Sequence, residues 1–136
     1  MPAEVAEPAQ VFVPITSDKG LCGAVNSSIV RDVKKFVVGK NRSKIQIFSI
    51  GEKGSVGMVR PFPDMLKYSI SQIGTPYNYP VVMAMAVHVT NLSQDADKVV
   101  IIYNEFKSAI SYIQRHMELM PKKRFLESMA FGKLYN

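Results

Sequence analysis

Apolar residues along the chain form short continuous runs that alternate with stretches of helical periodicity. Three runs of five or six residues, each bounded by turn-forming residues, favour buried strands over residues 11–15, 45–50 and 99–103. Pro14 has no backbone N–H to donate, so the first strand should lie at a sheet edge or end near this residue.

Two stretches between these runs predict helices. From Leu21 to Val37, apolar residues recur every three or four positions opposite a charged side, and Gly39 is suited to end the helix. Residues 52–60 predict a weaker helix, because Gly54 and Gly57 each cost it about 1 kcal/mol relative to alanine.

A third helix is predicted from residue 78 to residue 92. Asn78 is suited to cap it, and Pro80 falls in its first turn, where proline is tolerated. Its side chains are apolar almost all round, so we expect it to be well buried. His88 is then expected to be a hydrogen-bonded core residue rather than a ligand.

The remaining segments predict strands of two kinds. Residues 67–73 alternate between apolar and polar, which is typical of a half-exposed strand. Residues 105–120 fit a helix by propensity, yet residues 109–113 are rich in strand-forming side chains. We favour a strand there, with residues 104–108 as the hairpin loop.

The order of the predicted elements indicates an α/β fold. Strands that alternate with helices favour a mainly parallel sheet covered on both faces, with an antiparallel last strand at its edge. The length of 136 residues allows one domain. We expect a disordered lead over residues 1–10, the domain over residues 11–121, and a short tail with helical potential over residues 122–136.

Composition excludes several classes of protein. Apolar residues make up 47% of the chain and charged residues 21%, which excludes a disordered chain. The single cysteine, Cys22, excludes a disulfide scaffold and is expected to be a packing residue. The N-terminal residues resemble neither a secretory signal nor a transit peptide.

The chain is basic, with 17 Lys and Arg against 11 Asp and Glu and a formal net charge of +6. This balance allows nucleic acid, an anionic membrane or an acidic protein as a partner. No basic run is interleaved with stacking aromatic residues, so nucleic-acid binding is the least favoured.

No catalytic, cofactor or metal site is predicted from the side chains. The two histidines, His88 and His116, have no supporting ligand cluster, and Asp95 and Asp97 are expected to be solvated in a loop. Four methionines are expected to fill the core rather than form a binding surface. They are Met83, Met85, Met117 and Met120.

The turn over residues 16–23 is the one place where a ligand site is considered. Open α/β sheets bind ligands at such strand-to-helix junctions. However, Gly20 and Gly23 do not complete a dinucleotide-binding fingerprint. A tight structural turn is favoured, and a small nucleotide-binding α/β protein using Thr16–Gly23 is the alternative.

Residues 15–28, which read ITSDKGLCGAVNSS, resemble the signature of the γ subunit of F-type ATP synthases. Residues 50–54 (IGEKG) and 101–112 (IIYNEFKSAISY) resemble two further γ motifs, the last of them closest to mitochondrial members. The family supports a strand at residues 109–113. The family-motif positions, for which a structural role is expected, are Thr16, Ser17, Asp18, Lys19, Gly20, Leu21, Cys22, Gly23, Asn26, Ser27, Gly51, Lys53, Asn104, Phe106 and Ser108.

The resemblance implies a Rossmann-like globular domain of a rotor shaft that binds no nucleotide and needs no cofactor. Its implied partners are the c ring, the small central-stalk subunits and, through the long γ helices, the ring of α and β subunits. The implied location is peripheral, on the matrix side of the mitochondrial inner membrane, with the bacterial cytoplasmic membrane as the alternative.

The chain departs from the family pattern in one large respect. No heptad run precedes Val11 and none follows Pro121, whereas γ subunits carry a long helix on each side of the globular domain. The expectation is therefore a globular domain alone, whether as a fragment, as a chain described only in part, or as one piece of a split γ.

Overall fold

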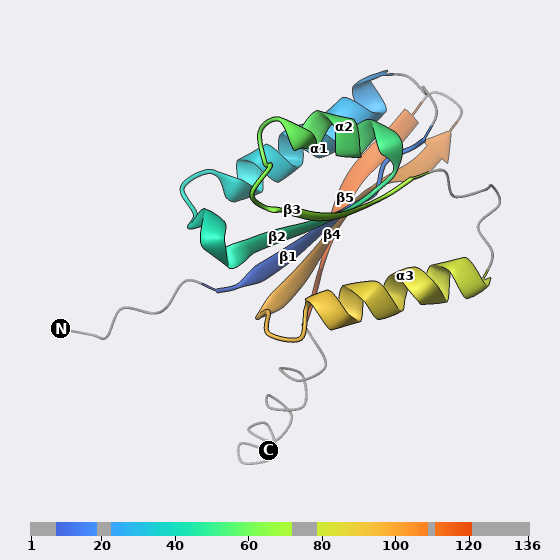
Figure 1. Ribbon diagram of the computed structural model, residues 1–136. Helices are drawn as coiled ribbons and strands as arrows, with labels where there is room; N and C mark the ends of the chain where they lie inside the picture. Colours follow the sequence, from blue (N-terminus) through green and yellow to red (C-terminus); the bar gives the residue numbers. More distant parts are fainter. Residues whose placement is uncertain (1–7, 19–22, 72–78, 109–110, 121–136) are drawn as a thin grey trace, which may run out of the picture.

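A computed structural model describes residues 8–18, 23–71, 79–108 and 111–120. Its five strands form one sheet in the order β3-β2-β1-β4-β5 (Figure 1). Neighbouring strands are parallel except for the antiparallel pair β4 and β5. The strands are β1 (Gln10–Pro14), β2 (Ile45–Ile50), β3 (Leu66–Ile70), β4 (Lys98–Ser108) and β5 (Ser111–Leu119).

Helices cover both faces of this sheet. Helices α1 (Gly23–Val37) and α2 (Glu52–Val59) lie on one face, and α3 (Tyr79–Leu92) lies on the other (Figure 1). A short 3-10 helix, η1 (Arg42–Lys44), precedes β2. The chain first adds β2 and β3 on one side of β1 and then returns to add β4 on the other side. Because each crossover between parallel strands is right-handed, this reversal of direction places α3 on the opposite face from α1 and α2. The predicted α/β class is confirmed.

Strand β1 lies at the centre of the sheet, and this position accounts for its apolar sequence. All five of its residues are buried, so a nearly continuous apolar run is required. Phe12 points into the core under α1 and α2, whereas Val11 and Val13 point into the core under α3. The strand ends at Pro14, as the missing N–H of that residue predicts.

Several predicted helix ends are also confirmed. Gly39 has φ of 77°, so it supplies the left-handed turn that ends α1. Pro80 is the second residue of α3, inside its first turn. The proposed cap, Asn78, lies outside the described residues.

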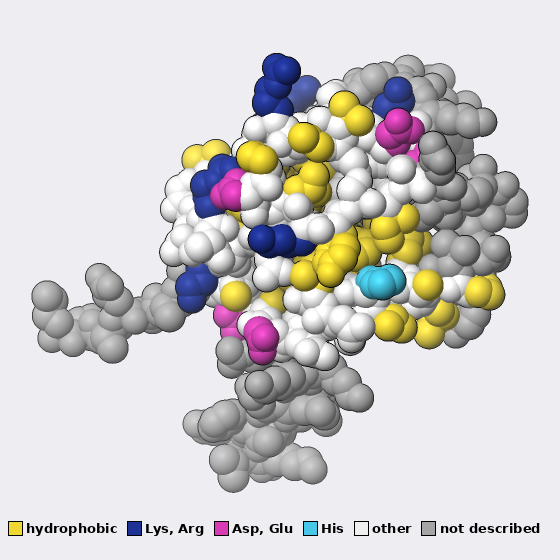
Figure 2. All heavy atoms as spheres, in the orientation of Figure 1, with side chains coloured by type: hydrophobic (Ala, Val, Ile, Leu, Met, Phe, Trp, Pro, Cys, Tyr) yellow, Lys and Arg dark blue, Asp and Glu magenta, His cyan; other side chains and the backbone are white. Residues whose placement is uncertain are grey.

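The expected burial of α3 is wrong. Met83 and Val87 are 44% and 53% exposed, and His88 is also exposed, with its ring 6.5 Å from that of Tyr68. Figure 2 shows apolar side chains gathered on this part of the surface, with a histidine among them. Among the described helices, α3 is alone on its face of the sheet, so they leave its outer side uncovered. The side chains packed on the sheet are Met85, Val89 and Leu92.

The expectation that the four methionines fill the core holds only for Met85, which packs against the sheet. Met117 and Met120 are 46% and 51% exposed, as Met83 is on α3. Alternation along β5 places Met117 beside Ile101, on the same face of the sheet as α3. No described helix covers that part of the face.

The C-terminal hairpin is longer than predicted. The strand expected at residues 109–113 is confirmed from Ser111 onward, but residues 104–108 belong to β4 and are not its loop. The ladder extends from Val99 opposite Leu119 to Ser108 opposite Ser111. Polar residues are tolerated in this hairpin because an antiparallel edge pair needs no burial on both faces.

The N-terminal boundary also needs correction. The backbone N–H of Ala9 donates to Asp97 Oδ2 at 2.8 Å, and the Ala9 carbonyl accepts from the Asp97 N–H at 2.7 Å. Gln10 already belongs to β1. Asp97 is therefore partly buried and hydrogen-bonded to the residue before β1, rather than solvated, whereas Asp95 is exposed as expected. The predictions for residues 1–7 and 121–136 lie outside the described residues.

Candidate functional site

The loop that follows β1 covers the beginning of α2. The backbone N–H groups of Glu52 and Lys53 donate to Asp18 Oδ1 and to the Ser17 carbonyl, each at 3.0 Å. The Gly54 N–H donates to Thr16 Oγ1 at 2.8 Å. We call this set of contacts, between Thr16–Asp18 and Gly51–Gly54, the loop junction.

The loop junction caps the amino end of α2. The first N–H groups of a helix have no partner within the helix, and free ones attract phosphate. At α2 these donors are already bonded to the other loop. The helix end therefore holds the two loops together and does not present vacant donors to an anion.

Thr16 lies at the centre of the loop junction and is only 7% exposed. While its hydroxyl accepts from Gly54, it donates toward the carbonyl oxygens of Ile50 at 3.1 Å and Gly51 at 3.3 Å. The Thr16 backbone N–H also donates to the Ile50 carbonyl, at 2.8 Å. One small side chain thus joins the end of β2 to the start of α2.

Asn26, the fourth residue of α1, fixes the same loop from the other side and belongs to the loop junction as well. Its Oδ1 accepts from the Ser17 N–H at 3.1 Å, and its Nδ2 donates to Ser17 Oγ at 2.8 Å. Asn26 is 8% exposed, so these bonds replace the water that a buried amide would otherwise lose.

Two glycines are required by the closeness of this packing. Gly51 has φ of 101°, and a Cβ there would collide with the carbonyl group of Thr16. A Cβ on Gly54 would lie 2.6 Å from both Oγ1 and Cγ2 of Thr16. Gly54 therefore serves close packing, although its sequence position in a short helix indicated only a loss of helical stability.

The structure brings together some of the motif positions and separates others. Thr16, Ser17, Asp18, Asn26, Gly51 and Lys53 meet at the loop junction. Gly23 begins α1 and Ser27 lies within it, whereas Asn104, Phe106 and Ser108 lie along β4. Lys19, Gly20, Leu21 and Cys22 lie outside the described residues. Gly54 was not included among the motif positions with a structural role. The sequence feature that could have indicated it is a second glycine three residues after Gly51.

The pair of side chains whose pKa values are shifted, Arg42 and Asp64, does not belong to the loop junction. The pKa of Asp64 is lowered mainly by its hydrogen bond from Arg42, whose own pKa is raised by the same contact. This pair is solvent-exposed, with Arg42 Nη2 2.5 Å from Asp64 Oδ1, so it adds little stability. Across residues 8–18, 23–71, 79–108 and 111–120, no group of three His, Cys, Asp or Glu residues is placed to hold a metal.

Thr16→Val is expected to destabilise the protein by about 1–3 kcal/mol, because it leaves the buried N–H of Gly54 without an acceptor while keeping the side-chain shape. The control is Thr90→Val, since Thr90 is exposed and its hydroxyl donates to the Ala86 carbonyl of its own helix. Urea unfolding followed by circular dichroism measures both. Equal midpoints for the two variants would contradict the role given to Thr16.

The fold and the loop junction together define a doubly wound, Rossmann-like α/β domain. The family model described as ATP synthase matches residues 2–133, and the chain belongs to that family. Curated relatives are γ subunits. The mitochondrial γ subunit of Saccharomyces cerevisiae is 29% identical over 96% of this chain, and the γ chain of Anaeromyxobacter dehalogenans is 34% identical over 83%.

Solved structures agree with the curated relatives. A chain in the Tetrahymena thermophila mitochondrial ATP synthase, central stalk and c-ring, superposes with a TM-score of 0.80 at 50% identity, over 90% of this chain and 55% of that one. A chain in the Euglena gracilis mitochondrial ATP synthase rotor has the same fold, with a TM-score of 0.76 at 24% identity over 90% of this chain and 43% of that one. The present chain spans 42% of the yeast relative and 40% of the bacterial one.

Proposed function

We propose that this chain acts as a non-catalytic part of the central stalk of an F-type ATP synthase. In this role it couples rotation of the c ring to ATP synthesis on the β subunits. The family match over residues 2–133 carries the proposal, and the 50% identity to a central-stalk chain supports it. The partners are the c ring, the small stalk subunits and the α and β subunits.

The proposed location follows from these partners. The chain lies at the matrix side of the mitochondrial inner membrane, with the bacterial cytoplasmic membrane as the alternative, since relatives of both kinds match. Within the described residues, no helix has the length and apolar character needed to cross a bilayer.

The motif positions that meet at the loop junction have a structural role in this proposal. A part that transmits torque must resist bending, and the loop junction joins the ends of β1 and β2 to the helices α1 and α2. Its hydrogen bonds use the first backbone N–H groups of α2, which are therefore not free to bind an anion. The γ-subunit relatives, rather than these donors, disfavour the alternative, a nucleotide-binding protein that uses the Thr16–Gly23 turn at the start of α1.

The purified chain is expected to bind no ATP in isothermal titration calorimetry, with magnesium present and with ATP up to millimolar concentration. Asp18→Ala is expected to lower the unfolding midpoint, because it removes the acceptor for the Glu52 N–H. Saturable micromolar binding that Asp18→Ala abolishes, at a temperature where the variant is folded, would favour the nucleotide-binding protein instead.

A further inference from the structure

Two loops lie beside each other at the end of the sheet where β2 and β3 begin. Helix α1 ends at Val37 and η1 leads into β2, while α2 ends at Val59 and a loop leads into β3. The guanidinium group of Arg42 in η1 donates to the Pro61 carbonyl at 3.0 Å, which joins the two loops. Figure 1 shows both loops toward the left of the view, at the opposite end from the start of α2.

Positive charge is concentrated in the first of these loops and in the helical turn before it. Five of the eleven residues 34–44 are basic, and residues 33–51 contain no Asp or Glu. The basic residues are Lys34, Lys35, Lys40, Arg42 and Lys44. Lys34 and Lys35 also complement the carboxyl end of α1, whereas the other three lie beyond the helix. We call these five residues, together with Val38, the basic end.

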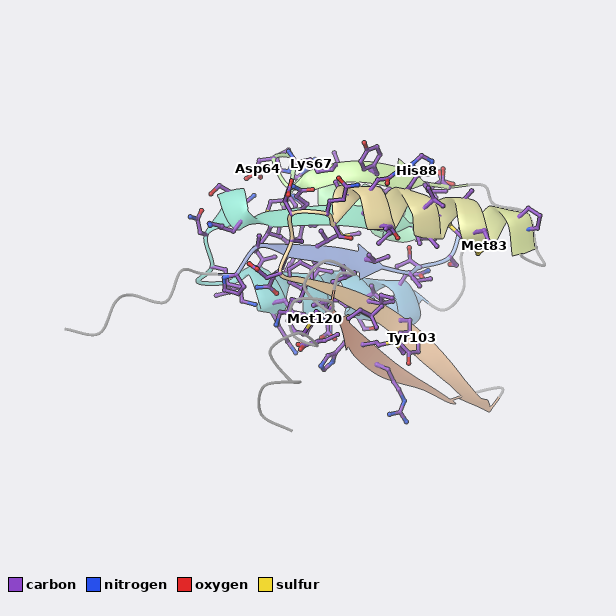
Figure 3. All side chains as sticks on the ribbon, turned by 90° about the horizontal axis from the view of Figure 1, so that it is seen from below. Asp64, Lys67, Met83, His88, Tyr103 and Met120 are labelled. Atoms are coloured by element: carbon purple, nitrogen blue, oxygen red, sulfur yellow. The ribbon has the colours of Figure 1, made fainter. Side chains whose placement is uncertain are left out.

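The described residues neutralise little of this charge. Asp64, from the neighbouring loop, pairs with Arg42 and is also within electrostatic reach of Lys67. Figure 3 shows Asp64 and Lys67 close to each other, far from Met83 on α3. Among the residues that the structure describes, no carboxylate forms an ion pair with the four lysines of the basic end. The basic end therefore carries positive charge that these residues do not balance.

An apolar side chain projects from the middle of this charge. Val38 is 77% exposed, more than any other large apolar side chain in the described part of the chain. The backbone holds it there, because the Val38 N–H donates to the Lys34 carbonyl at 3.1 Å. Gly39, with its φ of 77°, turns the chain directly afterwards. Val38 is thus presented to the solvent by an ordered turn.

A hollow of about 410 Å³ lies among these side chains. Three cations line it, and its apolar lining comes from both loops and the end of α1. The cations are Lys34, Lys40 and Arg42, and the apolar residues are Val37, Val38, Pro61 and Phe62. Cations beside apolar side chains suit a ligand that carries an anionic group on an apolar body.

We propose that the basic end binds the surface of an anionic phospholipid bilayer, with Val38 among the headgroups and the lysines against their phosphate groups. Basic residues near an anionic leaflet strengthen binding, and apolar side chains that enter the headgroup region add to it. Lysines without fixed partners suit the diffuse charge of many headgroups. The choice of a bilayer over an acidic protein rests on the proposed function, which places the chain at a membrane.

Vesicle flotation of the purified chain tests this proposal. Phosphatidylcholine vesicles with about 30% phosphatidylglycerol should bind at least about ten-fold more of the chain than phosphatidylcholine alone. Binding should decrease in about 1 M salt, because salt screens exposed charges. Equal binding to both kinds of vesicle, or binding to neither, would overturn the proposal and leave the basic end to an acidic segment of another subunit. The assignment to the ATP synthase would stand, because recovery of the chain with α and β tests it separately.

Two pairs of variants show which surface binds. Val38→Asp and Lys34→Gln should each lower binding to the anionic vesicles about five-fold. Val87→Asp on α3 and Lys53→Gln at the start of α2 make the same changes of charge at exposed positions, and binding should stay within about two-fold. Lys53 contacts the loop junction through its backbone N–H, which the substitution keeps. Equal losses within either pair, in variants with unchanged circular dichroism, would overturn the proposal by assigning binding to total charge.

Discussion

Gly51→Ala is expected to destabilise the protein by more than about 3 kcal/mol, a large share of the 5–15 kcal/mol typical of a domain. Gly51 has φ of 101°, which side chains rarely adopt, and its new Cβ would collide with the Thr16 carbonyl group. Relief of that collision requires the two loops to separate, which breaks the hydrogen bonds at the start of α2. Urea unfolding, or loss of the protein from the soluble fraction, measures the effect.

Gly39→Ala is the matched control for this change. Gly39 also has a positive φ, of 77°, but a Cβ there would meet nothing within 4 Å. Its cost should be only about 1 kcal/mol, from the backbone conformation alone. Equal losses in the two variants would show that backbone conformation, and not the closeness of the loops, accounts for the requirement at Gly51.

Phe12→Ala is expected to cost about 3–5 kcal/mol, because it opens a cavity in the centre of the sheet. Phe12 is fully buried on β1, and its ring lies 5.6 Å from that of Phe36 on α1. The control is Tyr68→Ala on the edge strand β3, where the side chain is 50% exposed and about 1 kcal/mol should be lost. Thermal unfolding by calorimetry compares them, and similar losses would contradict the described core.

The strands and helices were predictable where the local pattern of apolar residues is compatible with only one kind of element. Strand β1 is a continuous apolar run because both of its faces are buried, and α1 shows one apolar stripe because one side of it is buried. The resemblance to γ subunits resolved the hairpin strand, for which the residues alone left a helix open. The exact extent of the hairpin was not predictable, because residues 104–108 belong to β4 through their pairing with β5 and not through their composition.

The surroundings of α3 and of the loop junction were not predictable from local sequence. A helix that is apolar almost all round fits burial on all sides, yet exposure of Met83 and Val87 depends on how many helices share that face. The contact between Thr16 and Gly54 joins residues 38 positions apart. The resemblance in sequence points to the motif positions, but only the fold shows which residues they contact.

Recovery of the native chain from its source organism tests the assignment to the ATP synthase most directly. An antibody against the chain would be used on mitochondria or membranes solubilised in mild detergent, followed by a native gel and mass spectrometry. We expect the chain to migrate in a complex that hydrolyses ATP and contains the α and β subunits. A chain recovered only apart from α and β, while the ATP-hydrolysing complex lacks it, would contradict the assignment.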